Sequence, residues 1–243
     1  MQFGLFGSAA ARRGGPGFDS SEGFRDFIDY NIEAEALAVI LKAWTADAPF
    51  SHRGKYWQFD NIVVEPPTAQ KPCPPIWMGA GGENSIRRVA AQGFNLLLGQ
   101  YASPKDVAWN IAVYKTEVEA HGRRYDPMQI GVTRAFFVAE NAAEREAAME
   151  RRLANRVRQL KLATRPDGTV HGGPDRATGD PRVVNEVSAM YGTPDEIAEK
   201  LDALREAGVG YVLLNGGGSG GGARGRESLR RFAREVMPAF AER

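Results

Sequence analysis

The sequence predicts an α/β protein in which a parallel sheet is covered by helices. Short runs of consecutive apolar residues alternate along the chain with longer segments in which apolar residues recur every three or four positions. A strand buried on both faces produces the first pattern, and an amphipathic helix produces the second. Their regular alternation is typical of parallel strands joined by covering helices.

Composition excludes several classes of function. The chain has 243 residues, of which 43% are hydrophobic and 25% are charged, as in ordinary globular domains. The formal net charge of +1 provides no strong field for nucleic acid or for an anionic membrane. No run of 18 apolar residues is long enough to span a membrane. Cys73 is the single cysteine, which excludes an intrachain disulfide and favours a reducing, cytoplasmic location.

The first third of the chain has few strand signals. Residues 2–7 form a short apolar run that ends in glycine, which predicts a buried first strand. Apolar residues at helical spacing predict one continuous helix over about residues 24–45. From Phe50 the periodicity changes, and a turn at Arg53–Gly54 predicts a short hairpin.

The remaining two thirds alternate between strands and helices. We expect strands at residues 75–79, 94–99, 130–139 and 211–215. We expect helices at residues 85–92, 103–122, 141–163, 193–207 and 227–240, with a loop at 165–182. Ser103 and Thr193 each precede a proline, which is a signal for a helix start. The total is about five strands of barrel type, whereas a closed (β/α)8 barrel needs eight.

A glycine-rich turn follows the strand expected at 75–79. Its sequence, Gly79-Ala80-Gly81-Gly82-Glu83-Asn84-Ser85, leads directly into a helix. Glycines let a ligand approach the backbone, and free N–H groups at a helix start favour an anion such as phosphate. The side chain of Asn84 or Ser85 can cap the helix or bind that phosphate. A plain tight turn is an equally good interpretation, because the segment matches neither the Walker loop nor G-x-G-x-x-G.

Three other features give weaker signals. Residues 215–225 are so rich in glycine that a surface loop is the better interpretation, with Arg224 and Arg226 as a second phosphate candidate. The histidines have no partner at metal-ligand spacing, so we predict no metal site and interpret them as solvated; they are His52, His121 and His171. The basic residues within 151–161 are interpreted as a solvated helix face.

Four passages together resemble the bacterial-luciferase-like family of flavin-dependent monooxygenases. They are MQFGLFGS, the stretch from LAVILKAW to RRVAAQG, YGTPDEIAEKLDALREAGVGYVLLN, and SLRRFAREVMPAF. The resemblance implies a single TIM (β/α)8-type domain over residues 1–243 that uses reduced FMN and O2 to oxidise a small organic substrate. It also implies a separate flavin reductase and a homodimer. An F420-dependent oxidoreductase on the same barrel is the alternative.

The resemblance also places the cofactor. The implied cofactor-binding residues are Gly79, Ala80, Gly81, Gly82, Asn84, Ser85, Gly99 and Gln100. In the family, the loop matching the first six holds the flavin phosphate, and the strand end matching the last two lies near the isoalloxazine ring. No residue of this chain matches the family's acidic and histidine side chains, so the catalytic residues stay unassigned.

The helix expected over 24–45 joins two passages that the family keeps apart. In the family, a strand ending in an acidic residue and histidine, and two further βα units, separate the helix resembling EAEA from the one resembling LAVILKAW. Here the two meet at Ala36–Leu37. We interpret the junction as an internal deletion of roughly three βα units, which matches the shortage of strands. The sheet must then expose two edges, close as a smaller barrel, or borrow strands from a partner. A non-catalytic remnant that pairs with an intact barrel subunit is the alternative from another class.

Overall fold

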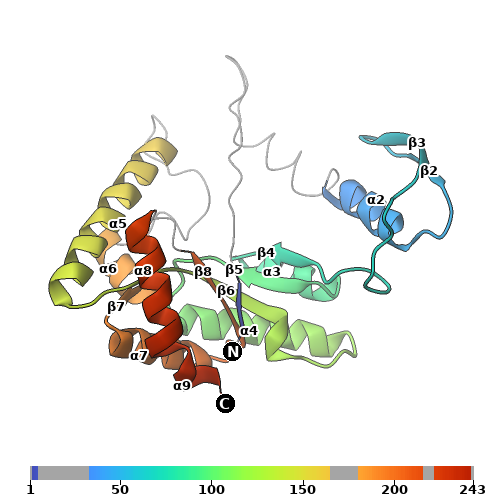
Figure 1. Ribbon diagram of the computed structural model, residues 1–243. Coiled ribbons are helices and arrows are strands. Elements are labelled where there is room, and N and C mark those ends of the chain that lie inside the picture. Colours follow the sequence, from blue (N-terminus) through green and yellow to red (C-terminus); the bar gives the residue numbers. More distant parts are fainter. Residues whose placement is uncertain (1, 5–32, 165–179, 216–221, 242–243) are drawn as a thin grey trace. The chain divides into compact units, whose positions relative to one another are not determined.

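The computed structural model of the chain describes residues 2–4, 33–164, 180–215 and 222–241 (Figure 1). The chain divides into two compact units. One contains residues 9–75, and the other contains residues 76–243 together with residues 1–8. The single domain over residues 1–243 stays a prediction. In the described part of the chain, no helix combines the length and apolar character that a membrane crossing requires.

The described part of the smaller unit, residues 33–75, contains one helix and one hairpin. Helix α2 (Glu33–Thr45) runs through the Ala36–Leu37 junction without a break. The continuous helix is therefore confirmed from residue 33 to residue 45, while residues 24–32 lie outside the described part. Strands β2 (Phe50–Arg53) and β3 (Gln58–Ile62) pair antiparallel, which confirms the predicted hairpin.

The Glu35 carboxylate joins helix α2 to this hairpin. It accepts hydrogen bonds from the backbone N–H of Trp57 at 2.8 Å and of Tyr56 at 3.1 Å. His52 Nε2 lies 3.2 Å from Glu35 Oε1, so the interpretation of this histidine as a solvated residue is wrong. A side chain at Gly54 would collide with the same carboxylate, because an added Cβ would lie 1.6 Å from Oε1. The turn therefore closes tightly around Glu35.

The hairpin's attachment should depend on pH. Burial by itself raises the pKa of Glu35, but hydrogen bonds from Trp57, Tyr56 and His52 outweigh it, so the pKa lies below its ordinary value of 4.5. A carboxylate with a lowered pKa stabilises the folded state above the ordinary value, and this contribution is lost as the pH falls through the folded pKa. We expect the exchange protection of the Tyr56 and Trp57 amides, corrected for intrinsic rates, to fall below about pH 4.5. In Glu35→Gln this pH dependence of the exchange protection should be absent. An unchanged pH dependence would show that the Glu35 carboxylate is not its cause.

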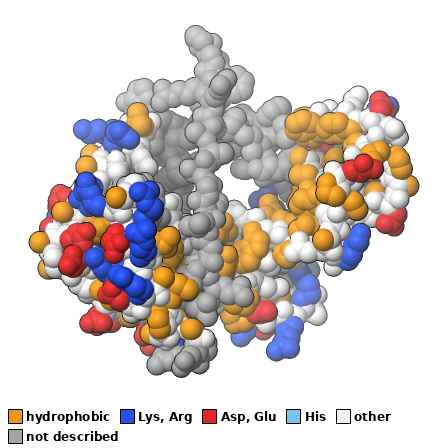
Figure 2. Space-filling model, in the orientation of Figure 1, with side chains coloured by type: hydrophobic (Ala, Val, Ile, Leu, Met, Phe, Trp, Pro, Cys, Tyr) orange, Lys and Arg blue, Asp and Glu red, His pale blue; other side chains and the backbone are white. Residues whose placement is uncertain are grey.

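Hydrophobic side chains gather on the surface of the smaller unit, as Figure 2 shows. The large exposed ones are Ile40, Trp57, Phe59, Val63 and Val64. Val63 is the most exposed of these, at 56%. A helix and one hairpin bury too little apolar surface to cover such side chains.

The larger unit is built on a parallel sheet. Its strands are β1 (Gln2–Gly4), β4 (Trp77–Gly79), β5 (Asn95–Leu98), β6 (Ile130–Val138), β7 (Met190–Gly192) and β8 (Tyr211–Asn215). The strand order is β1-β8-β6-β5-β4, and every pair is parallel. Strand β7 pairs with residues 136–138 of β6, directly beyond the segment 131–135 that pairs with β8. The predicted parallel α/β fold is confirmed.

Helices follow the strands as expected, with two differences. They are α3 (Glu83–Ala91), α4 (Pro104–Ala120), α5 (Ala142–Ala163), α6 (Pro181–Ser188), α7 (Pro194–Glu206), α8 (Ala223–Arg231) and α9 (Pro238–Ala241). Helix α8 begins at Ala223 instead of Glu227 and continues into α9 through a π-helical segment at Phe232–Val236. Helix α6 and strand β7 lie in a region where the sequence pattern predicted no element.

Cap residues explain the boundaries of α4 and α7. Ser103 and Asp106 form a capping box at the start of α4, with the Asp106 N–H donating to Ser103 Oγ at 3.1 Å. Thr193 and Glu196 form the same arrangement at the start of α7. Gly93, with φ at 77°, ends the turn after α3 in a left-handed conformation that glycine adopts at little cost.

The core lies between the sheet and helices α3, α4 and α7. Fully buried members of this cluster include Ile86, Leu96, Tyr114, Leu201 and Val212. A second cluster joins β6, α5 and β7 through residues such as Phe137, Met149 and Tyr191. All nine residues of β6 are buried, as expected for a central parallel strand.

The sheet is open in the described part of the chain. Its order ends at β1 on one side and at β4 on the other. Of the three arrangements expected for a barrel lacking strands, the described strands agree with the first, a sheet with two unpaired edges. In β4, the carbonyl of Ile76 and the N–H of Ala80 bond to β5, so the alternate peptide groups at Trp77 and Gly79 face the open edge.

Candidate cofactor site

Two loops meet at the carboxyl ends of strands β4 and β5. Residues 80–82 follow β4 and residues 99–103 follow β5, and the Ala80 N–H donates to Leu97 O at 3.2 Å. A pocket of about 390 Å³ opens beside them. It is lined by Gly81, Tyr101, Ala102, Ser103, Asp106, Trp109, Asn110, Val183, Val184 and Val187. Gly81 is the one predicted cofactor residue among those that line the pocket, and Gly99 and Gln100 precede its Tyr101 in the chain. The pocket lies at the carboxyl ends of the strands, where α/β proteins bind ligands.

The loop after β4 leaves a row of backbone donors at the start of helix α3. Gly82 is the N-cap residue, with φ −100° and ψ 150°, and no side chain caps the helix. The first helical bond is from the Ile86 N–H to Gly82 O at 3.0 Å. In the described part of the chain, the amides of residues 81–85 find no acceptor. Such donors, with the helix dipole behind them, suit an anionic group.

The side chains around these amides differ in what they can offer. The Ser85 hydroxyl donates to Gly82 O at 2.7 Å, so its proton forms a hydrogen bond within the turn and is not free for a ligand. Asn84 is exposed, and its amide group is available to a ligand. The Glu83 carboxylate binds Arg87 one turn further along the helix, at 2.8 Å, and Arg87 also binds Glu117. The carboxylate closest to the free amides is therefore neutralised.

The loop after β5 leaves open space at Gly99. A Cβ built on this residue would meet no atom of the described chain within 4 Å. The next residue, Gln100, donates from Nε2 to the Tyr101 hydroxyl at 3.3 Å and accepts through Oε1 from Arg152 Nη2 at 3.4 Å. A flat ring system can therefore approach the Gly99 backbone closely without displacing a side chain.

Arg134 of strand β6 holds this loop, a role that the sequence reasoning missed. Its guanidinium donates to Gly99 O at 3.2 Å, to Thr133 O at 3.1 Å and to Ala102 O at 2.7 Å. The side chain is only 1% exposed. Burial lowers the pKa of Arg134 to about 10, which leaves the group charged at neutral pH. A lone charged residue in a largely apolar strand was the available signal, because such a charge is rarely buried without partners.

Two arginines of helix α5 also face inward. Arg152 and Arg156 are each 7% exposed, so the interpretation of this segment as a solvated face is wrong for both. Arg152 Nε donates to Asn185 Oδ1 at 3.1 Å. The Arg156 guanidinium lies 4.0 Å from the centre of the Tyr101 ring. Arg158 of the same helix is exposed, as predicted.

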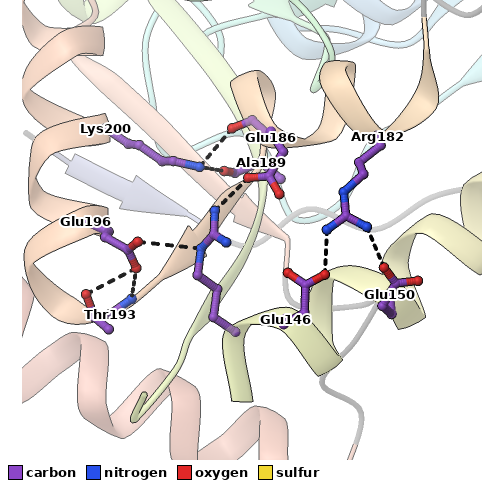
Figure 3. A network of polar contacts seen from close by, with 9 residues as sticks. Glu146, Glu150, Arg182, Glu186, Ala189, Thr193, Glu196 and Lys200 are labelled. Carbon is purple, nitrogen blue, oxygen red and sulfur yellow. Dashed lines mark hydrogen bonds and ion pairs between the residues drawn. The ribbon is translucent and has the colours of Figure 1, made fainter. Parts of the chain in front are cut away.

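A network of polar contacts fixes helix α6, which forms one side of the pocket (Figure 3). Arg182 of α6 pairs with Glu146 and Glu150 of α5. Lys200 of α7 donates to the carbonyls of Glu186 and Ala189 at the end of α6, at 3.0 Å and 2.7 Å. Burial lowers the pKa of Lys200. Helix α6 is therefore attached to α5 at its start and to α7 at its end.

The arginines and histidines that gave weaker signals in the sequence are not among the residues that line this pocket. Arg224 and Arg226 are exposed in the first turn of α8. His121 caps the end of α4 and its Nδ1 lies 2.9 Å from Glu117 O. His171 lies outside the described residues.

Solved structures share this fold. The oxygenating constituent of 3,6-diketocamphane monooxygenase from Pseudomonas putida, in complex with FMN, matches with a TM-score of 0.64 and 22% identity, over 84% of this chain and 62% of that chain. An F420-dependent secondary alcohol dehydrogenase matches with a TM-score of 0.59 and 16% identity, over 87% of this chain and 64% of that chain. The fold is thus of the TIM-barrel type in an incomplete form.

Sequence comparison identifies the family. The profile described as luciferase-like monooxygenase matches residues 28–211, and the chain belongs to this family. An FMNH2-dependent dimethylsulfone monooxygenase of Pseudomonas putida is 24% identical over 88% of this chain. The oxygenase component of a flavin-dependent trigonelline monooxygenase of Acinetobacter baylyi is 23% identical over 86% of this chain. In both cases the match covers 59% of the relative, so the chain spans about three fifths of their length.

Proposed function

We propose that this chain is a flavin-dependent oxidoreductase whose pocket at the ends of β4 and β5 binds reduced FMN. The free amides of residues 81–85, at the start of α3, are the observation that carries the proposal. They would bind the flavin phosphate, with the Asn84 side chain as a further donor. The open backbone at Gly99 and the side chain of Gln100 would face the isoalloxazine ring. Bound reduced flavin would supply the electrons with which O2 oxidises an organic substrate.

The proposed partners follow from what the chain lacks and from its relatives. The sequence has no nicotinamide-binding fingerprint, so reduced flavin would come from a separate reductase. The Acinetobacter relative is described as an oxygenase component, which supports a two-component system. A homodimer of single-domain chains remains part of the proposal.

F420 is the second candidate cofactor. The solved F420-dependent alcohol dehydrogenase shares the fold, and an array of backbone amides accepts any phosphate. Titration of the chain with FMN and with F420 separates the candidates, since the tighter ligand is the cofactor. If neither binds, the chain is a non-catalytic remnant.

Gly99 provides a test of the proposed pocket. We expect Gly99→Leu to weaken FMN binding at least about tenfold, because the new side chain would occupy the space next to the ring, and tenfold is about 1.4 kcal/mol. Thermal stability should not change, because the site is empty in the described part of the chain. Flavin fluorescence and thermal unfolding give the two readouts. Ala112→Leu places the same side chain at an exposed position on α4 and should leave both unchanged. Equal FMN affinity in Gly99→Leu and the unaltered chain would exclude this placement of the ring.

A further inference from the structure

Two buried guanidinium groups flank the loop after β5. Arg134 reaches it from β6 and binds the carbonyls of Gly99 and Ala102. Arg152 reaches it from α5 and binds the side chain of Gln100. Both are more than nine-tenths buried. Two charges removed from water therefore lie on one short segment.

The contacts of these arginines are with neutral groups. Arg134 binds three carbonyl oxygens, and Arg152 binds the amide oxygens of Asn185 and Gln100 and the side chain of Tyr191. In the described part of the chain, no carboxylate forms an ion pair with either one. Burial of a charge is costly unless an opposite charge or a full set of hydrogen bonds compensates it. The arrangement therefore favours an anion.

A neighbouring donor supports the same conclusion independently. Asn185 of α6 is fully buried, and its Oδ1 is occupied by Arg152. Its Nδ2 has no acceptor within the described residues. Buried amide donors without a partner are uncommon in folded proteins and call for an explanation. An anionic oxygen at this place would accept from Asn185 Nδ2 and would lie beside the charge of Arg152.

We propose that Arg152 and Asn185 form a subsite for the anionic end of the substrate, a carboxylate or a sulfonate. Tyr101 connects the subsite to the pocket, because it lines the pocket and its ring lies 5.7 Å from the Arg152 guanidinium. A planar guanidinium binds such groups through two parallel hydrogen bonds. The substrate class rests on the proposed function: the substrate would be an organic anion whose opposite end lies at the flavin.

The flavin phosphate is assigned to the other loop. The amides of residues 81–85 lie at the start of α3, whereas Arg152 and Asn185 belong to α5 and α6. An organic anion in the arginine subsite and FMN at the amides should therefore bind together. If the two ligands bind independently, the anion at Arg152 is the end of the substrate and not the flavin phosphate.

Benzoate and benzamide test the subsite on the full chain, because they differ in charge but little in shape. We expect calorimetry to show that benzoate binds at least tenfold more tightly than benzamide. Arg152→Met should weaken benzoate binding at least tenfold, while Arg158→Met removes an exposed arginine of the same helix and should have no effect. Equal affinity for the two ligands in the unaltered chain would overturn the proposal without any variant. So would unchanged benzoate affinity in a folded Arg152→Met.

The same titration with saturating FMN separates this proposal from the proposed function. An unchanged benzoate affinity supports a substrate subsite, whereas competition between the two ligands shows that the arginines take the flavin phosphate and overturns it. If FMN does not bind but benzoate is still preferred over benzamide, the proposed cofactor fails while the anion subsite stands.

Discussion

Supplied with reduced FMN, O2 and an organic substrate, the isolated chain should convert oxygen to hydrogen peroxide and form little or no oxygenated product. In the family, the strand that carries the acidic and histidine side chains lies between the two passages that meet here at Ala36–Leu37, and helix α2 runs through that junction without a strand. Loss of a positioned general acid or base typically lowers a rate by ~10²–10⁴. The sheet is also open in the described residues, and oxygen chemistry of this kind requires the exclusion of water. The measurement is the ratio of peroxide and of product to oxygen consumed.

A chimera provides the matched control. Insertion of the corresponding three βα units from an intact relative at Ala36–Leu37 should restore product formation coupled to oxygen use. Tight stoichiometric FMN binding with coupled product formation by the unaltered chain would instead show that the missing units are dispensable. Sequencing of the gene across this junction shows whether the units are present in the genome.

Arg134→Met should lower the free energy of unfolding by roughly 2–4 kcal/mol. The substitution keeps an apolar side chain of similar length in β6 but removes the donors to Gly99, Thr133 and Ala102. Carbonyls left without partners in a buried site cost more than the hydrogen bonds contribute when made. The loss of the buried charge offsets part of this cost, which is why we expect no larger effect. Urea unfolding gives the free energy directly.

Two further variants make the interpretation specific. Arg134→Lys keeps the charge but lacks the planar guanidinium that reaches Gly99 and Ala102 at once. Its free energy of unfolding should therefore lie between those of the unaltered chain and Arg134→Met. Arg158→Met removes a charge from the surface and should change the free energy of unfolding by less than about 0.5 kcal/mol. If Arg134→Met is as stable as the unaltered chain, the arginine does not hold the loop.

Much of the fold could be predicted because local signals determined it. Parallel strands such as β6 are buried on both faces and therefore appear as continuous apolar runs. Ser103 and Thr193 marked helix starts because their side chains bond to backbone groups of the first turn. The family resemblance indicated the barrel type and also indicated that some strands of the barrel are missing from this chain. The free amides at residues 81–85 also agree with the predicted turn.

The missed features depend on contacts between distant segments. Helix α6 and strand β7 are only eight and three residues long, too short for a clear periodic pattern. Asp180 before Pro181 was a usable helix-start signal, since the Asp180 side chain accepts from the Arg182 N–H. Arg152 and Arg156 were read as solvated because they are charged. Their spacing from the buried Met149, three and seven positions, places them on the same inward face of α5.

The pairing of β1 with β8 affects how the chain folds during its synthesis. Gln2 aligns with Tyr211, so the first strand pairs with a segment made 209 residues later (211 minus 2). At roughly 5–20 residues per second, a ribosome needs about 10–40 s to produce that segment. In the described sheet β1 has no earlier strand beside it. Among the described strands, β1 therefore has no partner for most of translation, and that interval is when a chaperone would have the greatest influence on the yield of folded chain.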